Sequence, residues 1–202
     1  MFSNIKYLIT TLYSYRKILL RVIIFELYYS IKNLEIIPNI KLQNSNFGTD
    51  TIPCIYYFLF KISQFIKKNK IKSVIDLGAG YGRVTNFIYV ENKIKVYGIE
   101  FDKEVFKKSL ILKKPNIKLY HDDILKVNLS KYNSSCFILV DPLKKKKDKK
   151  RLINRILKLK KYNKKLYIIA INMDKKIFLK KIKLLEKYIG SEGKSLRFFE
   201  VK

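Results

Sequence analysis

The sequence predicts an α/β domain with a parallel sheet, preceded by a helical extension. From residue 73 onward, short apolar runs alternate with segments of helical periodicity, which is typical of such a sheet. Runs such as Phe137 to Val140 are apolar throughout, as expected of strands covered on both faces. A glycine-spaced turn follows the first of these runs. With 202 residues, 48% of them hydrophobic, the chain fits one domain.

The N-terminal segment, residues 5–31, is strongly apolar but carries interrupting charges. No uninterrupted run reaches the roughly 18–20 residues that span a bilayer. No small-residue cleavage site follows a short apolar region, so we expect no cleaved signal peptide. In a helix, one narrow polar stripe would contain Lys6, Thr10, Ser14, Lys17, Arg21, Tyr28 and Lys32.

Two interpretations of this N-terminal helix stay open. We favour a helix that packs on the domain, because most of its surface is apolar and needs a cover. The alternative is a basic amphipathic helix that rests on an anionic membrane.

The remaining elements follow from apolar periodicity. Pro53 suits the first turn of a second helix over residues 56–67. Strands are predicted over 73–77, 94–99, 116–120, 136–140 and 165–171, with helices over 82–91, 102–113, 147–161 and 174–181. Residues 182–189 and 195–201 flank a glycine-containing turn and predict a terminal hairpin with an antiparallel strand.

This pattern divides the chain at residue 50. Residues 1–50 would form the N-terminal amphipathic helix and a polar loop. Residues 51–202 would form the ligand-binding domain. We expect residues 46–51 to fold over the ligand as a lid that excludes water.

The glycine-spaced turn is the strongest functional signal. A buried strand ends at Asp76 and Leu77, and Gly78, Gly80 and Gly82 follow at alternate positions before a helix. Glycines there permit positive φ angles and let the backbone approach a ligand closely. The helix start offers free N–H groups at the carboxyl edge of the sheet, where α/β proteins bind nucleotides.

Acids also follow the next three predicted strands. Glu100 ends the second strand, where a carboxylate can accept hydrogen bonds from both hydroxyls of a ribose. Asp122 and Asp123 follow the third strand, where one of them can accept from an adenine amino group. Asp141 follows the fourth strand, in the crevice where the strand order of such sheets reverses.

Taken together, DLGAGYG, GIE, HDDI and VDPL resemble the motifs of class I S-adenosylmethionine-dependent methyltransferases. The resemblance implies a seven-stranded sheet in the order 3-2-1-4-5-7-6 and S-adenosylmethionine as cofactor. It implies that Asp76, Gly78 and Gly80 hold the methionine part of the cofactor. It further implies that Glu100 binds the ribose and Asp123 the adenine.

The match covers residues 71–171, and GYGRV within it is similar to small prokaryotic and mitochondrial members, some of which modify protein lysines. One departure concerns enzymes that methylate amino groups of bases. Leu143 and Lys144 stand where many of those carry a proline and an aromatic residue, so the ring on which a flipped base would stack is missing. By its position, Asp141 is the predicted catalytic residue, accepting a hydrogen bond from an attacking amine.

The excess of basic residues indicates an anionic partner. Lys and Arg total 44 against 16 acids, a net charge of +28, and the run 144–150 concentrates lysines after the fourth strand. We slightly favour a protein lysine or other amine as acceptor, with RNA as a close rival. A non-catalytic basic adaptor is a further alternative.

Cys54 and Cys136 are expected to be buried free thiols in a reducing cytoplasm, and no metal site is expected. We expect a cytoplasmic monomer. Peripheral contact with the inner membrane face through residues 5–31 remains the open alternative.

Overall fold

The computed structural model describes residues 13, 15–33, 49, 51–112, 114–178, 181–190 and 194–202. The start of the predicted N-terminal helix and most of the predicted lid therefore lie outside the described residues.

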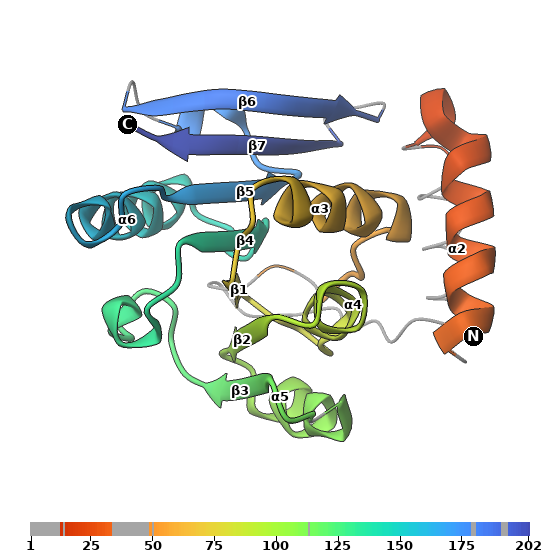
Figure 1. The fold of residues 1–202 in the computed structure, drawn as a ribbon, viewed down its shortest axis with the longest axis horizontal. Helices are drawn as coiled ribbons and strands as arrows, with labels where there is room; N and C mark the ends of the chain where they lie inside the picture. The colour runs from red at the N-terminus through yellow and green to blue at the C-terminus, as the bar shows by residue number, and fades with distance from the viewer. Residues whose placement is uncertain are drawn as a thin grey trace.

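A seven-stranded sheet forms the centre of the domain (Figure 1). Its order is β3-β2-β1-β4-β5-β7-β6, which confirms the expected topology. The first five strands run parallel, while β7 is antiparallel to both β5 and β6. The strands are β1 (Ser73–Leu77), β2 (Lys95–Glu100), β3 (Ile117–His121), β4 (Cys136–Val140), β5 (Tyr167–Ile171), β6 (Ile182–Ile189) and β7 (Ser195–Val201).

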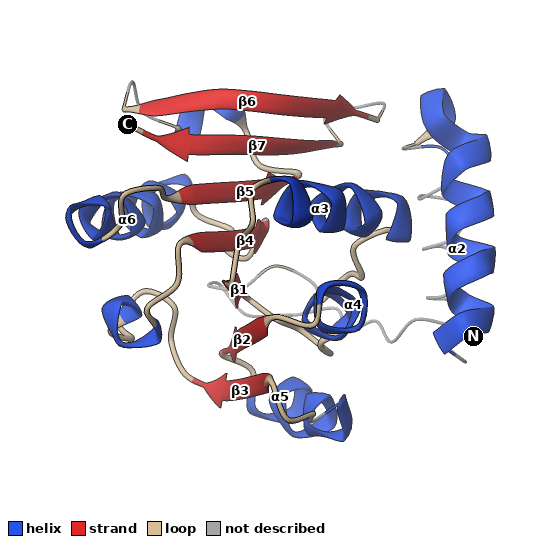
Figure 2. Cartoon of the chain, viewed as in Figure 1, coloured by secondary structure: helices blue, strands red, loops and turns tan. Residues whose placement is uncertain are grey.

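Helices cover both faces of this sheet (Figure 2). The α-helices are α2 (Leu19–Asn33), α3 (Tyr56–Lys68), α4 (Arg83–Asn92), α5 (Lys103–Ser109) and α6 (Lys146–Leu157). Short 3-10 helices are η1 (Arg16–Ile18), η2 (Leu110–Leu112), η3 (Leu129–Tyr132), η4 (Lys158–Tyr162) and η5 (Lys175–Ile177).

The core has one layer on each side of the sheet. Successive side chains of a strand point to opposite faces. In β4, therefore, Cys136 and Ile138 pack in the layer with α3 and α4, while Phe137 and Leu139 pack in the layer with α6. This arrangement explains why the sequence of β4 is apolar without alternation.

The predicted helix over 174–181 is wrong. Its described residues form only the 3-10 turn η5, which Asp174 caps by accepting from the Lys176 N–H at 2.9 Å. Phe178 is already extended, and its ring stacks on Phe199 at 4.2 Å. Packing against β7 therefore overrides the helical pattern.

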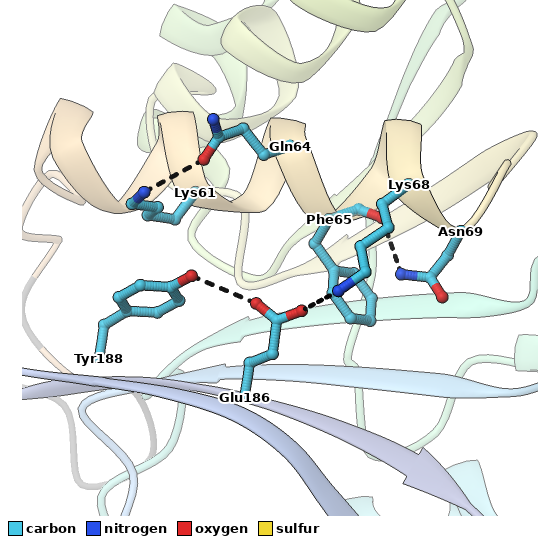
Figure 3. A network of polar contacts seen from close by, with 7 residues as sticks. All are labelled: Lys61, Gln64, Phe65, Lys68, Asn69, Glu186 and Tyr188. Atoms are coloured by element: carbon cyan, nitrogen blue, oxygen red, sulfur yellow. Dashed lines mark hydrogen bonds and ion pairs between the residues drawn. The ribbon is translucent and has the colours of Figure 1, made fainter.

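Polar contacts join α3 to the edge strand β6 (Figure 3). Lys68 forms an ion pair with Glu186 at 3.0 Å, and Glu186 also accepts a hydrogen bond from the Tyr188 hydroxyl at 3.2 Å. Beneath them, the Phe65 ring packs against Phe198 of β7 at 4.5 Å. Through these contacts, α3 lies over the antiparallel hairpin.

Helix α2 packs on the domain beside α3, as the favoured interpretation expected. Tyr29 lies 5.2 Å from the Tyr56 ring and 4.9 Å from the Phe87 ring, while Phe25 contacts Phe60 at 4.9 Å. These aromatic pairs belong to the same core layer as β1 and β4. In the part of the chain that the structure describes, no helix has the length and apolarity needed to cross a bilayer.

Candidate functional site

A cavity of about 930 Å³ opens beside the glycine turn, at the carboxyl ends of β1 and β2. Of the sequence-predicted site residues, Gly78, Gly80, Glu100 and Asp123 line it. Such an edge is where sheets of this class bind nucleotide ligands. The volume is in the range of small-molecule and cofactor sites.

The glycine turn has a backbone that side chains would block. Gly78 and Gly80 have φ angles of 86° and 56°, in the left-handed region. A Cβ atom at Gly78 would lie 2.7 Å from the Pro142 Cβ, and one at Gly80 would lie 2.9 Å from the Thr51 Cγ2. Both positions therefore require glycine, and the turn presents bare backbone to the cavity.

Glu100 connects this turn to the end of β2. One carboxylate oxygen accepts from the Gly80 N–H at 2.8 Å, and the other accepts from the Asp102 N–H at 2.8 Å. Burial raises the pKa of Glu100, and these backbone hydrogen bonds oppose the shift. Each oxygen keeps a second lone pair with which a ligand hydroxyl could bond.

Asp76 lies beneath the turn and does not line the cavity wall. Its side chain is fully buried, and neither carboxylate oxygen has a hydrogen-bond partner among the described residues. Burial, and then the nearby charge of Glu100, raise its pKa well above the usual range. A buried carboxylate without a partner suits a ligand that brings a positive charge or N–H donors.

The loop after β3 presents Asp123 to the cavity, while Asp122 serves as a loop residue. The Asp122 carboxylate accepts from the Asp123 N–H at 2.8 Å. Asp123 accepts from the Leu125 N–H at 2.8 Å through one oxygen. The choice of Asp123 over Asp122 thus agrees with the placement of the two side chains.

Arg155 of α6 holds this loop in place. Its guanidinium donates to the carbonyls of Ile124, Lys126 and Val127, at 2.6 Å and 3.2 Å for the first two. In the sequence, Arg155 follows shortly after the lysine run 144–150. In the structure its donors are committed to the loop that carries Asp123.

Asp141 lies between two residues of the cavity wall, Val140 and Pro142, but does not itself line the cavity. It lines a second pocket of about 580 Å³ at the ends of β4 and β5. Its carboxylate pairs with Lys149, and its carbonyl accepts from the Thr49 hydroxyl at 2.7 Å. Burial raises the pKa of Asp141, and Lys149 opposes this shift.

An ion pair between Arg83 at the cavity wall and Glu26 behind it was not among the predicted site features. Arg83, the first residue of α4, lines the cavity and donates to Glu26 of α2 at 3.2 Å and to the Cys54 carbonyl at 3.1 Å. Glu26 also accepts from the Tyr56 N–H at the start of α3. One feature of the sequence could have pointed to this pair: Glu26 is a single acid within a long apolar helical segment.

Comparison with protein families identifies one domain. Residues 68–197 match the family model of a methyltransferase domain. The matched range includes the glycine turn and all six predicted site residues. A comparison with curated protein sequences found no match.

Solved structures with the same fold include several enzymes at low identity. An RNA methyltransferase from Salinibacter ruber, in complex with S-adenosyl-L-homocysteine, is 14% identical with a TM-score of 0.57, over 74% of this chain and 94% of that one. The N-methyltransferase NodS from Bradyrhizobium japonicum WM9, also with S-adenosyl-L-homocysteine, is 12% identical with a TM-score of 0.55. The match covers 71% of this chain and 83% of that one. Magnesium protoporphyrin IX methyltransferase from Synechocystis PCC 6803, with bound cofactor, is 12% identical with a TM-score of 0.54, over 70% and 76%. Because these enzymes act on different acceptors, the fold does not identify the acceptor.

Proposed function

The chain belongs to the methyltransferase-domain family, and from that premise we propose that it methylates RNA held across a basic pocket beside Asp141. It is an S-adenosylmethionine-dependent methyltransferase. The acceptor is the part that we propose.

The described residues fit the cofactor. The buried, unpartnered carboxylate of Asp76 suits the cationic methionine end, and Gly78 and Gly80 line the cavity with bare backbone that this part could approach. Glu100 and Asp123 line the cavity wall, where their carboxylates would accept hydrogen bonds from ribose and adenine. When bound, the cofactor supplies a methyl group on a sulfonium that is already activated, so the protein's task is alignment and exclusion of water.

The observation that carries the proposal is the charge of the second pocket. Among the described residues, its lining contains four cations, namely Lys175, Lys187, Lys194 and Arg197, together with Asp141, Asn172, Met173 and Asp174. Val140 and Pro142, on either side of Asp141, line the cofactor cavity. The two spaces are therefore neighbours, and a group bound in the basic pocket would lie near the bound cofactor.

The signs of these charges favour a polyanion. Phosphates of a nucleic acid would be attracted to the four cations, and such contacts position the chain without reading its sequence. A protein lysine brings a positive charge and would be repelled by the same groups. The charge of the pocket therefore supports RNA over the protein amine that the sequence slightly favoured.

A protein amine remains the second candidate because of two carboxylates. Asp141 and Asp174 both line the basic pocket and could hold an ammonium group between them. In either case, we expect Asp141 to orient the acceptor, and its carboxylate is paired with Lys149.

The test is to identify what the enzyme labels. Extract from the source cells is incubated with the protein and cofactor carrying a labelled methyl group, then treated with ribonuclease or protease. We expect the label to become acid-soluble after ribonuclease. The double variant Lys187→Glu and Lys194→Glu should lower labelling at least about tenfold, because it reverses two charges of the basic pocket.

A matched control makes the same charge change elsewhere. Lys118 of β3 and Lys131 of η3 are exposed and do not line either pocket. Lys118→Glu with Lys131→Glu should leave most of the labelling intact. Label that resists ribonuclease but is released by protease would refute the RNA acceptor and establish the protein amine.

A further inference from the structure

Helix α2 has a second apolar face that the domain leaves uncovered. The inner face packs on the domain through Val22, Phe25 and Tyr29. On the opposite side, Leu20, Leu27 and Ile31 are 72%, 60% and 74% exposed. Aliphatic side chains exposed as a group mark an interaction site, whereas single exposed residues need no explanation.

The exposed side chains form one continuous stripe, which we call the outer stripe: Leu20, Ile23, Ile24, Leu27 and Ile31. Their spacing of three or four residues places them on the same side of a helix. The outer stripe runs along almost all of α2, roughly 16 Å at 1.5 Å per residue. In Figure 1, α2 stands at the margin of the molecule, and its inner side meets α3 and α4.

The charges around the outer stripe are of one sign. Arg16, Lys17 and Arg21 are exposed on α2 and the turn before it. The one acid between residues 15 and 33 is Glu26, which is turned inward to Arg83 and the start of α3. An apolar stripe bordered by cations, with its acid withdrawn, is the pattern of a helix that lies in the interface of an anionic bilayer.

We infer that α2 is a peripheral membrane anchor, with the outer stripe inserted among the acyl chains of an anionic bilayer and the flanking cations at the headgroups. The domain is then held on the membrane by a helix whose other face belongs to the core. This inference concerns where the enzyme acts and does not depend on which acceptor it methylates.

A second copy of the chain fits the outer stripe less well. The face of a 15-residue helix measures roughly 22 Å by 10 Å, or about 220 Å². A stable protein interface takes about 800 Å² from each partner. The basic borders would also face each other in a symmetric pair and repel. A bilayer requires neither a large area nor an opposite charge pattern on a folded partner.

The sharpest test uses the absence of tryptophan from the chain. Leu27→Trp places a single indole on the outer stripe. We expect its emission to shift to shorter wavelength with vesicles of phosphatidylglycerol and phosphatidylcholine, and acyl-chain bromination to quench it. The matched control Leu184→Trp lies on the exposed part of β6 and should show neither effect.

Sedimentation with the same vesicles measures the contribution of the outer stripe. The variant Leu20→Gln, Leu27→Gln and Ile31→Gln should lose at least tenfold in vesicle binding while it retains cofactor binding. Gln is a good helix former, so α2 should persist. The control Tyr162→Gln, Leu184→Gln and Ile189→Gln removes three exposed apolar side chains elsewhere and should bind vesicles normally.

Three results would overturn the inference. The first is that the unaltered protein fails to bind anionic vesicles. The second is that the indole of the Leu27→Trp variant stays unquenched while the protein sediments, which would assign binding to the basic surface alone. The third is that the protein elutes as a dimer which the triple outer-stripe variant dissociates, which would assign the stripe to a second copy.

Discussion

At Asp76 the fold buries a carboxylate whose charge no described residue compensates. The glycine turn above it is also specialised, since Gly78 and Gly80 have left-handed φ angles and present bare backbone to the cavity. Burial of a charge without a partner lowers stability, and such positions are found where a ligand supplies the missing interaction. Asp76 is therefore expected to favour binding at the expense of the stability of the cofactor-free protein.

This trade-off can be measured with Asp76→Asn. The variant should raise the free energy of unfolding of the cofactor-free protein at neutral pH by on the order of 1–3 kcal/mol, since a neutral amide avoids the cost of burying a carboxylate charge or of protonating it. Its affinity for S-adenosylmethionine should fall by about tenfold or more. Urea denaturation and calorimetric titration give the two numbers. A variant that is both less stable and unchanged in affinity would contradict the role.

The free energy of unfolding should depend on pH differently in the unaltered protein and in Asp76→Asn. The raised pKa means that folded Asp76 holds its proton at pH values where the unfolded chain has lost it. The free energy of unfolding of the unaltered protein should therefore decrease as pH rises from the ordinary aspartate pKa through the raised one. Asp76→Asn should lack this decrease, and below the ordinary pKa the two proteins should converge.

For single residues, the sequence located the acids that follow strands but not the side chains that surround them. Asp76, Glu100 and Asp123 were predictable because the carboxyl ends of parallel strands share an edge. That Asp141 would line the neighbouring pocket depends on a positive φ of 40° and a pair with Lys149, which no sequence pattern specifies. Likewise, Glu26 and Arg83 are 57 residues apart and meet only through tertiary packing.

Between elements, Glu26 is the contact on which α2, α3 and α4 converge. It accepts from Arg83 of α4 and from the first backbone N–H of α3. Arg83 is itself buried, and its guanidinium lies 4.3 Å from the centre of the Tyr56 ring. The N-terminal helix is thereby linked to a side chain of the cofactor cavity.

Glu26→Gln should uncouple this junction. We expect a loss of about 1–3 kcal/mol in the free energy of unfolding, because the buried charge of Arg83 would lose the carboxylate that compensates it. Cofactor affinity should fall as well, since Arg83 lines the cavity. The matched control is Glu91→Gln, which removes an exposed pair between α4 and Lys32 of α2 and should cost less than about 1 kcal/mol. Equal losses in the two variants would show that Glu26 has no special role.

The strands were easier to predict than the helices. Strand positions followed from short apolar runs and agree with the structure to within one or two residues. Helix ends were set by contacts that the sequence does not display, such as the stacking of Phe178 on Phe199, which ends η5 after one turn. The basic pocket was also beyond prediction, because its four cations are scattered among many other lysines.

For the whole molecule, charge is the dominant property. With 44 cations and 16 acids, at least 28 cations have no acid to pair with. Exposed like charges repel one another over roughly 30 Å at 0.01 M salt but only about 8 Å at 0.15 M. The folded state concentrates these charges, so self-repulsion opposes folding at low salt.

Salt should therefore stabilise this protein. We expect the melting temperature to rise by several degrees as sodium chloride increases from about 0.01 M to about 0.3 M, with most of the rise at the low end. Glucose at matched osmolality is the control, because it does not screen charge. A melting temperature that falls with salt would mean that attractive ion pairs outweigh the repulsion.

The position of α2 in the chain has a consequence for the time course of synthesis. The aromatic contact between Tyr29 and Phe87 and the bond between Glu26 and Arg83 join α2 to residues translated almost sixty positions later. At 5–20 residues per second, roughly 3–12 s pass before those partners exist. Throughout that interval both sides of the helix lack their cover. A bilayer close to the ribosome therefore competes for the segment before the domain that will hold it has been made.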